Sequence, residues 1–123
     1  MPDETETVAC LRQAVQAFVD ERDWRQFHTP KNLAMSLAIE AAELMEHFQW
    51  LDTAGAVARG RDPVHREAIA DEMADVCCYL LSLANSLEID LSSAVRSKLA
   101  KNARKYPAEQ CRGRFDRPAE SGS

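Results

Sequence analysis

The chain has 123 residues, of which 46% are hydrophobic and 28% charged, and its formal net charge is −5. This length can bury a core within one domain, and this composition is typical of a soluble globular protein. The negative charge argues against binding to the backbone of a nucleic-acid polymer. No apolar run reaches the roughly 20 residues of a membrane span, so we expect no membrane partner. The acidic start, MPDETET, lacks the pattern of a signal peptide, so we expect a cytoplasmic location.

Apolar residues recur at helical spacing along the chain, which predicts an all-α fold with four helices. Thr29 before Pro30 and Asp62 before Pro63 give two start signals, each a capping side chain followed by proline. The predicted helices run from about Thr7 to Asp23, from Pro30 to about Leu51, from Pro63 to about Leu87, and from Asp90 or Ser92 to about Tyr106. The segments DWRQFH and DTAGAVARGRD are interpreted as the first two connections.

These helices predict a four-helix bundle protomer in a single domain, residues 1–106, followed by an irregular tail, residues 107–123. The helix predicted from Pro30 carries a long apolar seam, and Met35, Ile39 and Ala42 beside that seam are apolar as well. One small bundle would leave such flanking residues uncovered. We therefore expect the protomers to assemble as an oligomer.

The four cysteines are Cys10, Cys77, Cys78 and Cys111, and they form no C-x-x-C pair and no spacing typical of a zinc site. Cys77 and Cys78 are adjacent on a predicted helix, where a mutual disulfide would be strained. We expect four reduced thiols, of which at least one is buried.

Two pairs of acidic residues border the apolar seams of the two long helices. Glu40 and Glu43 form E-x-x-E on one helix, and Glu72 and Asp75 form E-x-x-D on the other. If these helices pack antiparallel, four carboxylates converge, and their mutual repulsion favours a cation among them. Oxygen ligands suit Mg²⁺, with Mn²⁺ as the alternative ion. One carboxylate, Glu40 or Glu43, would then act as the general base.

Two other interpretations of the acidic residues are open at this point. A di-iron centre in a helical bundle needs Glu-x-x-His on two helices, and the sequence contains no such motif. Alternatively, the acidic residues are solvated helix faces, and the chain is a helical partner-binding protein without enzymatic activity.

Further polar and aromatic residues are candidates for binding a nucleotide. Lys98, Asn102 and Lys105 share one face of the last predicted helix, with Tyr106 beside them, and this combination suits phosphate groups. Tyr79 follows Asp75 by one helical turn and could donate its hydroxyl to a phosphate. The aromatic residues that flank the first acidic pair, Trp24, His28 and Trp50, could stack on a nucleobase.

Four segments carry a resemblance to a known family, in this order: WRQFHTPKNL, EAAELMEHFQW, ADEMADVCCYLL and SKLAKNARKYP. Through them the sequence resembles the MazG-like all-α nucleoside triphosphate pyrophosphohydrolases, and most closely the dCTP pyrophosphatase branch. The likeness spans residues 11–107. It implies a four-helix protomer that assembles as a tetramer, a dimer of dimers, with sites formed partly between subunits. It also implies Mg²⁺-dependent hydrolysis of a (deoxy)nucleoside triphosphate, such as dCTP or a modified nucleotide, to monophosphate and pyrophosphate. This is the chemistry of nucleotide pool sanitation.

The resemblance also implies a role for each matching residue. The metal would be held by Glu40, Glu43, Glu72 and Asp75, the phosphates or sugar by Tyr79, Lys98, Asn102, Lys105 and Tyr106, and the base by Trp24 and Trp50 with His28 nearby. One position departs from the pattern: Val15 stands where the animal dCTP pyrophosphatases have a histidine. The preferred base, whether cytosine, another pyrimidine or a modified base, is therefore left open.

Overall fold

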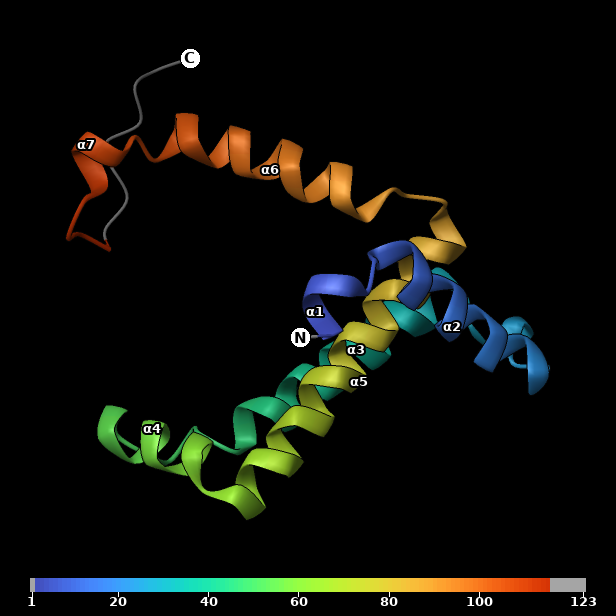
Figure 1. Ribbon diagram of the computed structural model, residues 1–123, viewed down its shortest axis with the longest axis horizontal. Helices are drawn as coiled ribbons and strands as arrows, with labels where there is room; N and C mark the ends of the chain where they lie inside the picture. Colours follow the sequence, from blue (N-terminus) through green and yellow to red (C-terminus); the bar gives the residue numbers. More distant parts are fainter. Residues whose placement is uncertain (1, 116–123) are drawn as a thin grey trace. The chain divides into compact units, whose positions relative to one another are not determined.

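The computed structural model describes residues 2–115, and these residues are helical with no strand, as predicted (Figure 1). The helices are α1 Pro2–Thr5, α2 Val8–Glu21, the 3₁₀ helix η1 Arg25–Phe27, α3 Pro30–Glu46, α4 Thr53–Arg61, α5 Pro63–Leu87, α6 Leu91–Lys105 and α7 Ala108–Cys111. The chain divides into two compact units, Met1–Ile89 and Asp90–Ser123. The single domain expected over residues 1–106 stays a prediction.

Helix starts follow the capping signals in the sequence. The hydroxyl of Thr29 accepts a hydrogen bond from the backbone N–H of Asn32 at 3.3 Å, with Pro30 in the first turn of α3. Asp90 caps α6 in the same way, accepting from the backbone N–H of Ser93 at 3.0 Å. Asp62 begins α5 without a capping hydrogen bond, because its carboxylate contacts the ring of His65 instead.

Two predicted boundaries in the middle of the chain are wrong. Helix α3 ends at Glu46 rather than near Leu51, and residues 47–50 continue as turns. The segment expected to be a connection forms α4, because the Asp52 carboxylate accepts a hydrogen bond from the Gly55 N–H at 2.7 Å and caps the first turn.

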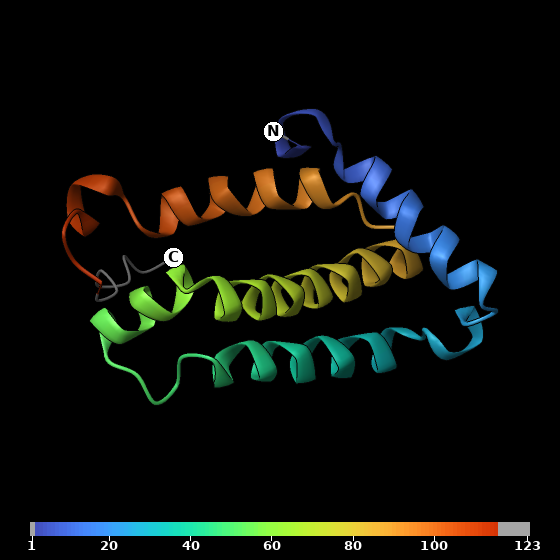
Figure 2. The same ribbon diagram turned by 60° about the horizontal axis from the view of Figure 1, so that its bottom comes forward.

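Helices α3 and α5 run antiparallel and side by side through the first unit (Figure 2). Helices α2 and α4 also pack on α5, with α2 across the end of the pair where α3 begins and α5 ends. Leu33 of α3 is only 2% exposed and is the centre of the core. The other buried apolar side chains are Val19, Ile69, Leu81 and Ala84.

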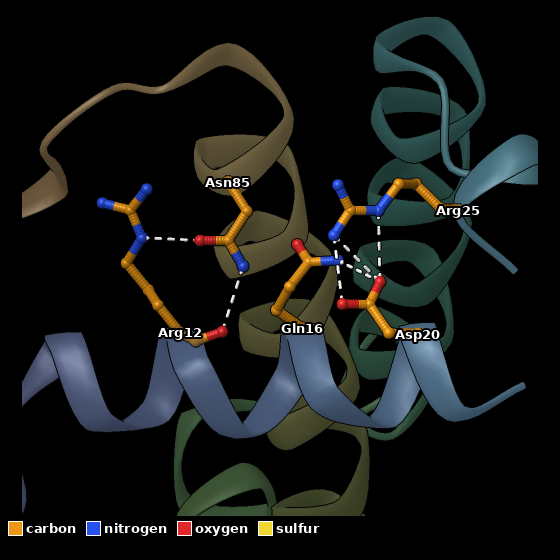
Figure 3. Close-up of polar contacts among 5 residues, drawn as sticks. All are labelled: Arg12, Gln16, Asp20, Arg25 and Asn85. Atoms are coloured by element: carbon orange, nitrogen blue, oxygen red, sulfur yellow. Dashed lines mark hydrogen bonds and ion pairs between the residues drawn. The ribbon is translucent and has the colours of Figure 1, made fainter. Parts of the chain in front are cut away.

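A polar clamp fixes α2 across the end of α5 (Figure 3). Arg12 donates from Nε to Asn85 Oδ1 at 2.9 Å and from Nη1 to the backbone carbonyl of Ile89 at 2.8 Å. Asn85 Nδ2 in turn donates to the backbone carbonyl of Arg12 at 3.1 Å. Because both amide atoms of Asn85 have partners, the register between these two helices is fixed.

Large apolar side chains of α3 and α5 are exposed in the protomer, including Met35, Ile39, Met73, Leu80 and Leu87. The sequence predicts a core seam on α5 at Ile69, Met73, Val76, Leu80, Leu83 and Leu87. Ile69 of this seam is buried and Val76 and Leu83 are half-buried, but Leu81 and Ala84, which lie outside the seam, are buried as well. The apolar repeat of α5 therefore covers more than the face that meets α3. The four-helix bundle stays a prediction, since α6 lies in the second unit.

The second unit contains α6 and α7. Lys105 Nζ lies 5.5 Å from the ring centroid of Tyr106, a cation–π contact at the end of α6. Helix α7 lies in the segment expected to be irregular, and residues 116–123 of that segment lie outside the described residues.

The four cysteines are free thiols, as expected. The expectation that one of them is buried is wrong for the protomer, because Cys10, Cys77 and Cys78 are exposed and Cys111 is half-buried. Among residues 2–115, no helix is both long enough and apolar enough to cross a membrane.

Candidate metal and nucleotide site

Three carboxylates converge where α3 and α5 lie side by side. Glu40 and Glu43 are one turn apart on α3, and Glu72 comes from α5; one oxygen of each lies within 4.8 Å of the others. The i, i+3 spacing places the two α3 side chains on neighbouring positions of one face, and the antiparallel packing brings Glu72 opposite them. The predicted convergence of acidic residues is confirmed for these three.

The electrostatics of this cluster are unfavourable without a cation. Oε2 of Glu40 and Oε2 of Glu72 are buried and accept no hydrogen bond. The facing carboxyl of Glu72, then burial, and then the neighbouring Glu43 and Asp75 raise the pKa of Glu40 from its usual 4.5 to about 7. Buried acceptors normally have donors, so this cluster is incomplete as it stands.

Asp75 is one turn beyond Glu72 on α5 and is exposed. It does not belong to the group of three whose oxygens lie within 4.8 Å, although its charge contributes to the raised pKa of Glu40. Its role as a fourth metal ligand stays a prediction.

The cluster fits a hard divalent cation. All of its donors are carboxylate oxygens, two of them are buried without hydrogen bonds, and the group contains no histidine or cysteine. Mg²⁺ and Mn²⁺ prefer this donor set, and Mg²⁺ is commonly completed by water and substrate phosphates. Di-iron carboxylate bundles use histidine beside glutamate, which these three residues do not provide.

The aromatic residues before α3 form a small group. Trp24 meets Phe18 edge to face, with ring centroids 5.8 Å apart, and stacks on His28 at 6.5 Å. Trp24 is 43% exposed, so part of its ring is available to a ligand. Trp50 follows α3 in a turn and is 87% exposed in the protomer. A place for Trp50 in the base pocket stays a prediction.

A polar cavity of about 270 Å³ lies at the end of the α3–α5 pair that α2 crosses. Its lining residues are Gln16, Val19, Arg25, His28, Ser82, Asn85, Ser86 and Glu88. His28 is one of the lining residues, and its Nδ1 is buried and has no hydrogen-bond partner among the described residues.

The cavity and the acidic cluster share one stripe of α5. Glu72, Asp75, Tyr79, Ser82 and Ser86 follow alternating steps of three and four residues, which keeps them on one face of the helix. Ser82 is seven residues beyond Asp75 and ten beyond Glu72, so the cavity begins roughly 10 Å along the helix from Asp75 and roughly 15 Å from Glu72. Tyr79 is half-buried between the two, where it could reach a ligand that spans them.

The predicted phosphate-binding residues Lys98, Asn102 and Lys105 lie on α6, and helical geometry keeps them on one face as expected. Tyr106 caps this helix at its C-terminal end. These four residues belong to the second unit, so their approach to the acidic cluster stays a prediction.

Sequence reasoning missed most of the cavity. Gln16, Ser82, Asn85 and Ser86 are short or neutral polar residues on helices, and none of them belongs to a recognisable motif. The available signal was the polar continuation of the α5 stripe beyond Tyr79, at Ser82 and Ser86, where an ordinary core-facing stripe would be apolar.

Comparisons with known proteins agree with this geometry. The MazG-like family model matches residues 35–114. Human dCTP pyrophosphatase 1 is 42% identical over 106 residues, which cover 86% of this chain and 62% of the human protein. The rat dCTP pyrophosphatase 1 is 40% identical over 107 residues, which cover 87% of this chain and 63% of the rat protein. The chain thus spans less than two thirds of the length of these relatives.

A solved structure of similar fold is a pyrophosphatase from Archaeoglobus fulgidus, with a TM-score of 0.69 and 42% identity. The likeness covers 77% of this chain and 87% of the archaeal one. The family match covers more than half of the chain and includes Glu40, Glu43 and Glu72. The chain belongs to the MazG-like family.

Proposed function

We propose that this protein is a Mg²⁺-dependent pyrophosphohydrolase that converts dCTP or a similar deoxynucleoside triphosphate to monophosphate and pyrophosphate. The observation that carries the proposal is the cluster of Glu40, Glu43 and Glu72, with two buried oxygens that accept no hydrogen bond. The proposal is also supported by relatives, because proteins named dCTP pyrophosphatase 1 are about 40% identical to this chain over most of its length.

The carboxylates hold the charge that the reaction requires. Mg²⁺ at this cluster, or Mn²⁺ in its place, would supply positive charge that neutralises the triphosphate. Glu40 or Glu43 accepts the proton of the attacking water. The remaining carboxylates of the cluster, with Asp75 beside them, would hold the ion. Little covalent chemistry is needed from the protein, since positioning and electrostatics supply most of the acceleration of phosphoryl transfer.

The other predicted residues complete the substrate site in this proposal. Tyr79 donates to a phosphate from the α5 stripe that joins the acidic cluster to the cavity. The face of α6 with Lys98, Asn102 and Lys105 binds the phosphates, with Tyr106 at its end. The nucleobase lies against Trp24 and His28, whose stacked rings are partly exposed.

The proposal includes assembly as a tetramer in the cytoplasm. Its support is the set of exposed apolar side chains on α3 and α5, which is large beside the five buried apolar residues found within residues 2–115. Trp50, at 87% exposure, would be covered by a neighbouring subunit and would complete a base pocket there. Four free thiols accord with a reducing compartment.

The experiment is an assay of pyrophosphate release from a panel of nucleoside triphosphates, with Mg²⁺ and with excess chelator. We expect release from dCTP only with the ion, and loss of at least two orders of magnitude in kcat for Glu72→Gln. The matched control is Glu46→Gln, an exposed glutamate on α3 outside the cluster. Absence of release from every triphosphate, with thermal stability indifferent to Mg²⁺, would favour a non-enzymatic helical protein instead.

A further inference from the structure

The cavity beside His28 has the position and the lining of a site that reads a nucleobase. It begins at Ser82, roughly 15 Å beyond Glu72 of the cluster along one stripe of α5, a distance that an extended nucleoside triphosphate can span. Its volume of about 270 Å³ lies just below the roughly 300–1,000 Å³ of ligand pockets, so it suits the base end of a nucleotide rather than a whole triphosphate. Ser82, Ser86 and Gln16 bring polar side chains that can hydrogen-bond to a base edge, and Arg25 and Glu88 bring charges. Both amide atoms of Asn85 are already bonded to Arg12.

One of these side chains, Gln16, is held in a single orientation. Its Nε2 donates to Oδ1 of Asp20 at 2.9 Å, and Arg25 donates to both oxygens of the same carboxylate at 3.0–3.1 Å (Figure 3). The hydrogen bonds from Gln16 and Arg25 hold the pKa of Asp20 below its usual value. Asp20 is therefore ionised at neutral pH and can only accept hydrogen bonds.

Because the Asp20 carboxylate can only accept hydrogen bonds, it determines which end of the Gln16 amide faces it. The NH₂ group must point to Asp20, so the carbonyl oxygen Oε1 points the other way, as Figure 3 shows. No donor from residues 2–115 is hydrogen-bonded to this oxygen. Gln16 lines the cavity, so it brings an acceptor of fixed orientation to the cavity wall.

We propose that Gln16 is the residue that selects the base: its Oε1 accepts a hydrogen bond from the exocyclic amino group of the substrate, so that cytosine-type bases are preferred over uracil-type bases. Asp20 and Arg25 are positioning residues in this proposal, because they act only through Gln16. Cytosine presents an amino donor where uracil and thymine present a carbonyl acceptor, which would repel Oε1. The inference rests on the proposed hydrolysis of nucleoside triphosphates and adds the rule by which the base is chosen.

The cavity wall supports this assignment independently. His28 lines the cavity, and its ring is stacked on Trp24. A base that enters here meets the residue His28 and the acceptor of Gln16. An aromatic pair of this kind also favours a planar ligand.

The test compares dCTP with dUTP, which differ in the group that Gln16 would contact. We expect the wild-type protein to prefer dCTP in kcat/KM, and Gln16→Leu to lower the dCTP-to-dUTP ratio by about tenfold, the effect of one hydrogen bond of base discrimination. The matched control is Gln13→Leu, the same change on the same helix at an exposed position outside the cavity. Its ratio should equal that of the wild type.

A second variant separates positioning from structure. In Asp20→Asn the partner amide can either donate or accept, so Gln16 is free to turn its NH₂ group toward the base. We expect the dCTP-to-dUTP ratio to fall in this variant while the melting temperature stays close to that of Gln13→Leu. An unchanged ratio in both Gln16→Leu and Asp20→Asn, with folded and active proteins, would overturn the proposal.

A binding measurement without phosphates separates this proposal from the proposed function. Titration of wild-type protein with deoxycytidine or deoxyuridine, followed by Trp fluorescence or ligand NMR, needs no hydrolysis. Tighter binding of deoxycytidine that disappears in Gln16→Leu would support base selection even if no triphosphate were hydrolysed. Equal binding of the two nucleosides, or binding unaffected by Gln16→Leu, would contradict it even if the enzyme were active.

Discussion

Binding of Mg²⁺ at the carboxylate cluster should release protons, and the number released should depend on pH in a defined way. Glu72, burial and the neighbouring acidic residues raise the pKa of Glu40 to about 7 in the metal-free protein. Metal binding requires the carboxylate form, so the proton held by Glu40 must leave when the ion enters. The variant Glu40→Gln has no such proton to lose.

The expected magnitude follows from this pKa. With a value of about 7, the metal-free carboxyl is about nine-tenths protonated at pH 6, half protonated at pH 7 and one-tenth protonated at pH 8. Binding of one Mg²⁺ should therefore release ~0.9, ~0.5 and ~0.1 protons at these three pH values. Most of the change lies within two pH units around neutrality.

Calorimetric titration in buffers of different ionisation enthalpy measures this release directly. Glu46→Gln, an exposed change outside the cluster, should release the same number of protons as the wild type. Glu40→Gln should release almost none. Mg²⁺ binding to the wild type at pH 6 without proton release would show that Glu40 is already ionised and that the neighbouring carboxylates do not raise its pKa to about 7.

Other predictions concern stability and substrate binding. Because the pKa of Glu40 is higher in the folded than in the unfolded state, the melting temperature of metal-free protein should fall as pH rises from 4.5 to about 7, and saturating Mg²⁺ should remove this fall; differential scanning fluorimetry measures both. Leu33→Ala should lower the free energy of unfolding by about 2–5 kcal/mol in urea titrations, since Leu33 is 2% exposed; no loss would show that the core is elsewhere. Asn85→Ala should cost about 1–3 kcal/mol because it leaves Arg12 without its partner on α5. Lys98→Ala should raise KM for the triphosphate in steady-state kinetics, whereas Lys101→Ala, on another face of α6, should not.

The helices with clear capping signals were predictable from the sequence. Thr29 before Pro30 marked the start of α3, and Asp62 before Pro63 marked the start of α5, because a capping position and proline each restrict the backbone locally. Helix α4 was not predictable by periodicity, since Gly55 and Gly60 lower its intrinsic helicity. The helix is stabilised by the capping carboxylate of Asp52 and by packing against α5. The packing is a tertiary contact, which a local sequence pattern does not reveal.

The acidic cluster was partly predictable, and the cavity was not. The spacing of Glu40 and Glu43 gives one helix face, and antiparallel packing with α5 supplies Glu72, so helical geometry is sufficient for these three residues. Asp75 has the same spacing but lies outside the group of three, because the exact rotation of α5 decides which carboxylate faces α3. Gln16 reaches its site only through the crossing of α2 over α5, which depends on contacts between Arg12 and Asn85 that no local pattern predicts.

The most direct test of the central claim is pyrophosphate release from dCTP by the purified protein, measured with Mg²⁺ for the wild type, Glu72→Gln and Glu46→Gln. We expect release by the wild type and by Glu46→Gln, and almost none by Glu72→Gln, with all three proteins equally helical by circular dichroism. Full activity in a folded Glu72→Gln protein would contradict it, because the cluster between α3 and α5 would then take no part in the reaction.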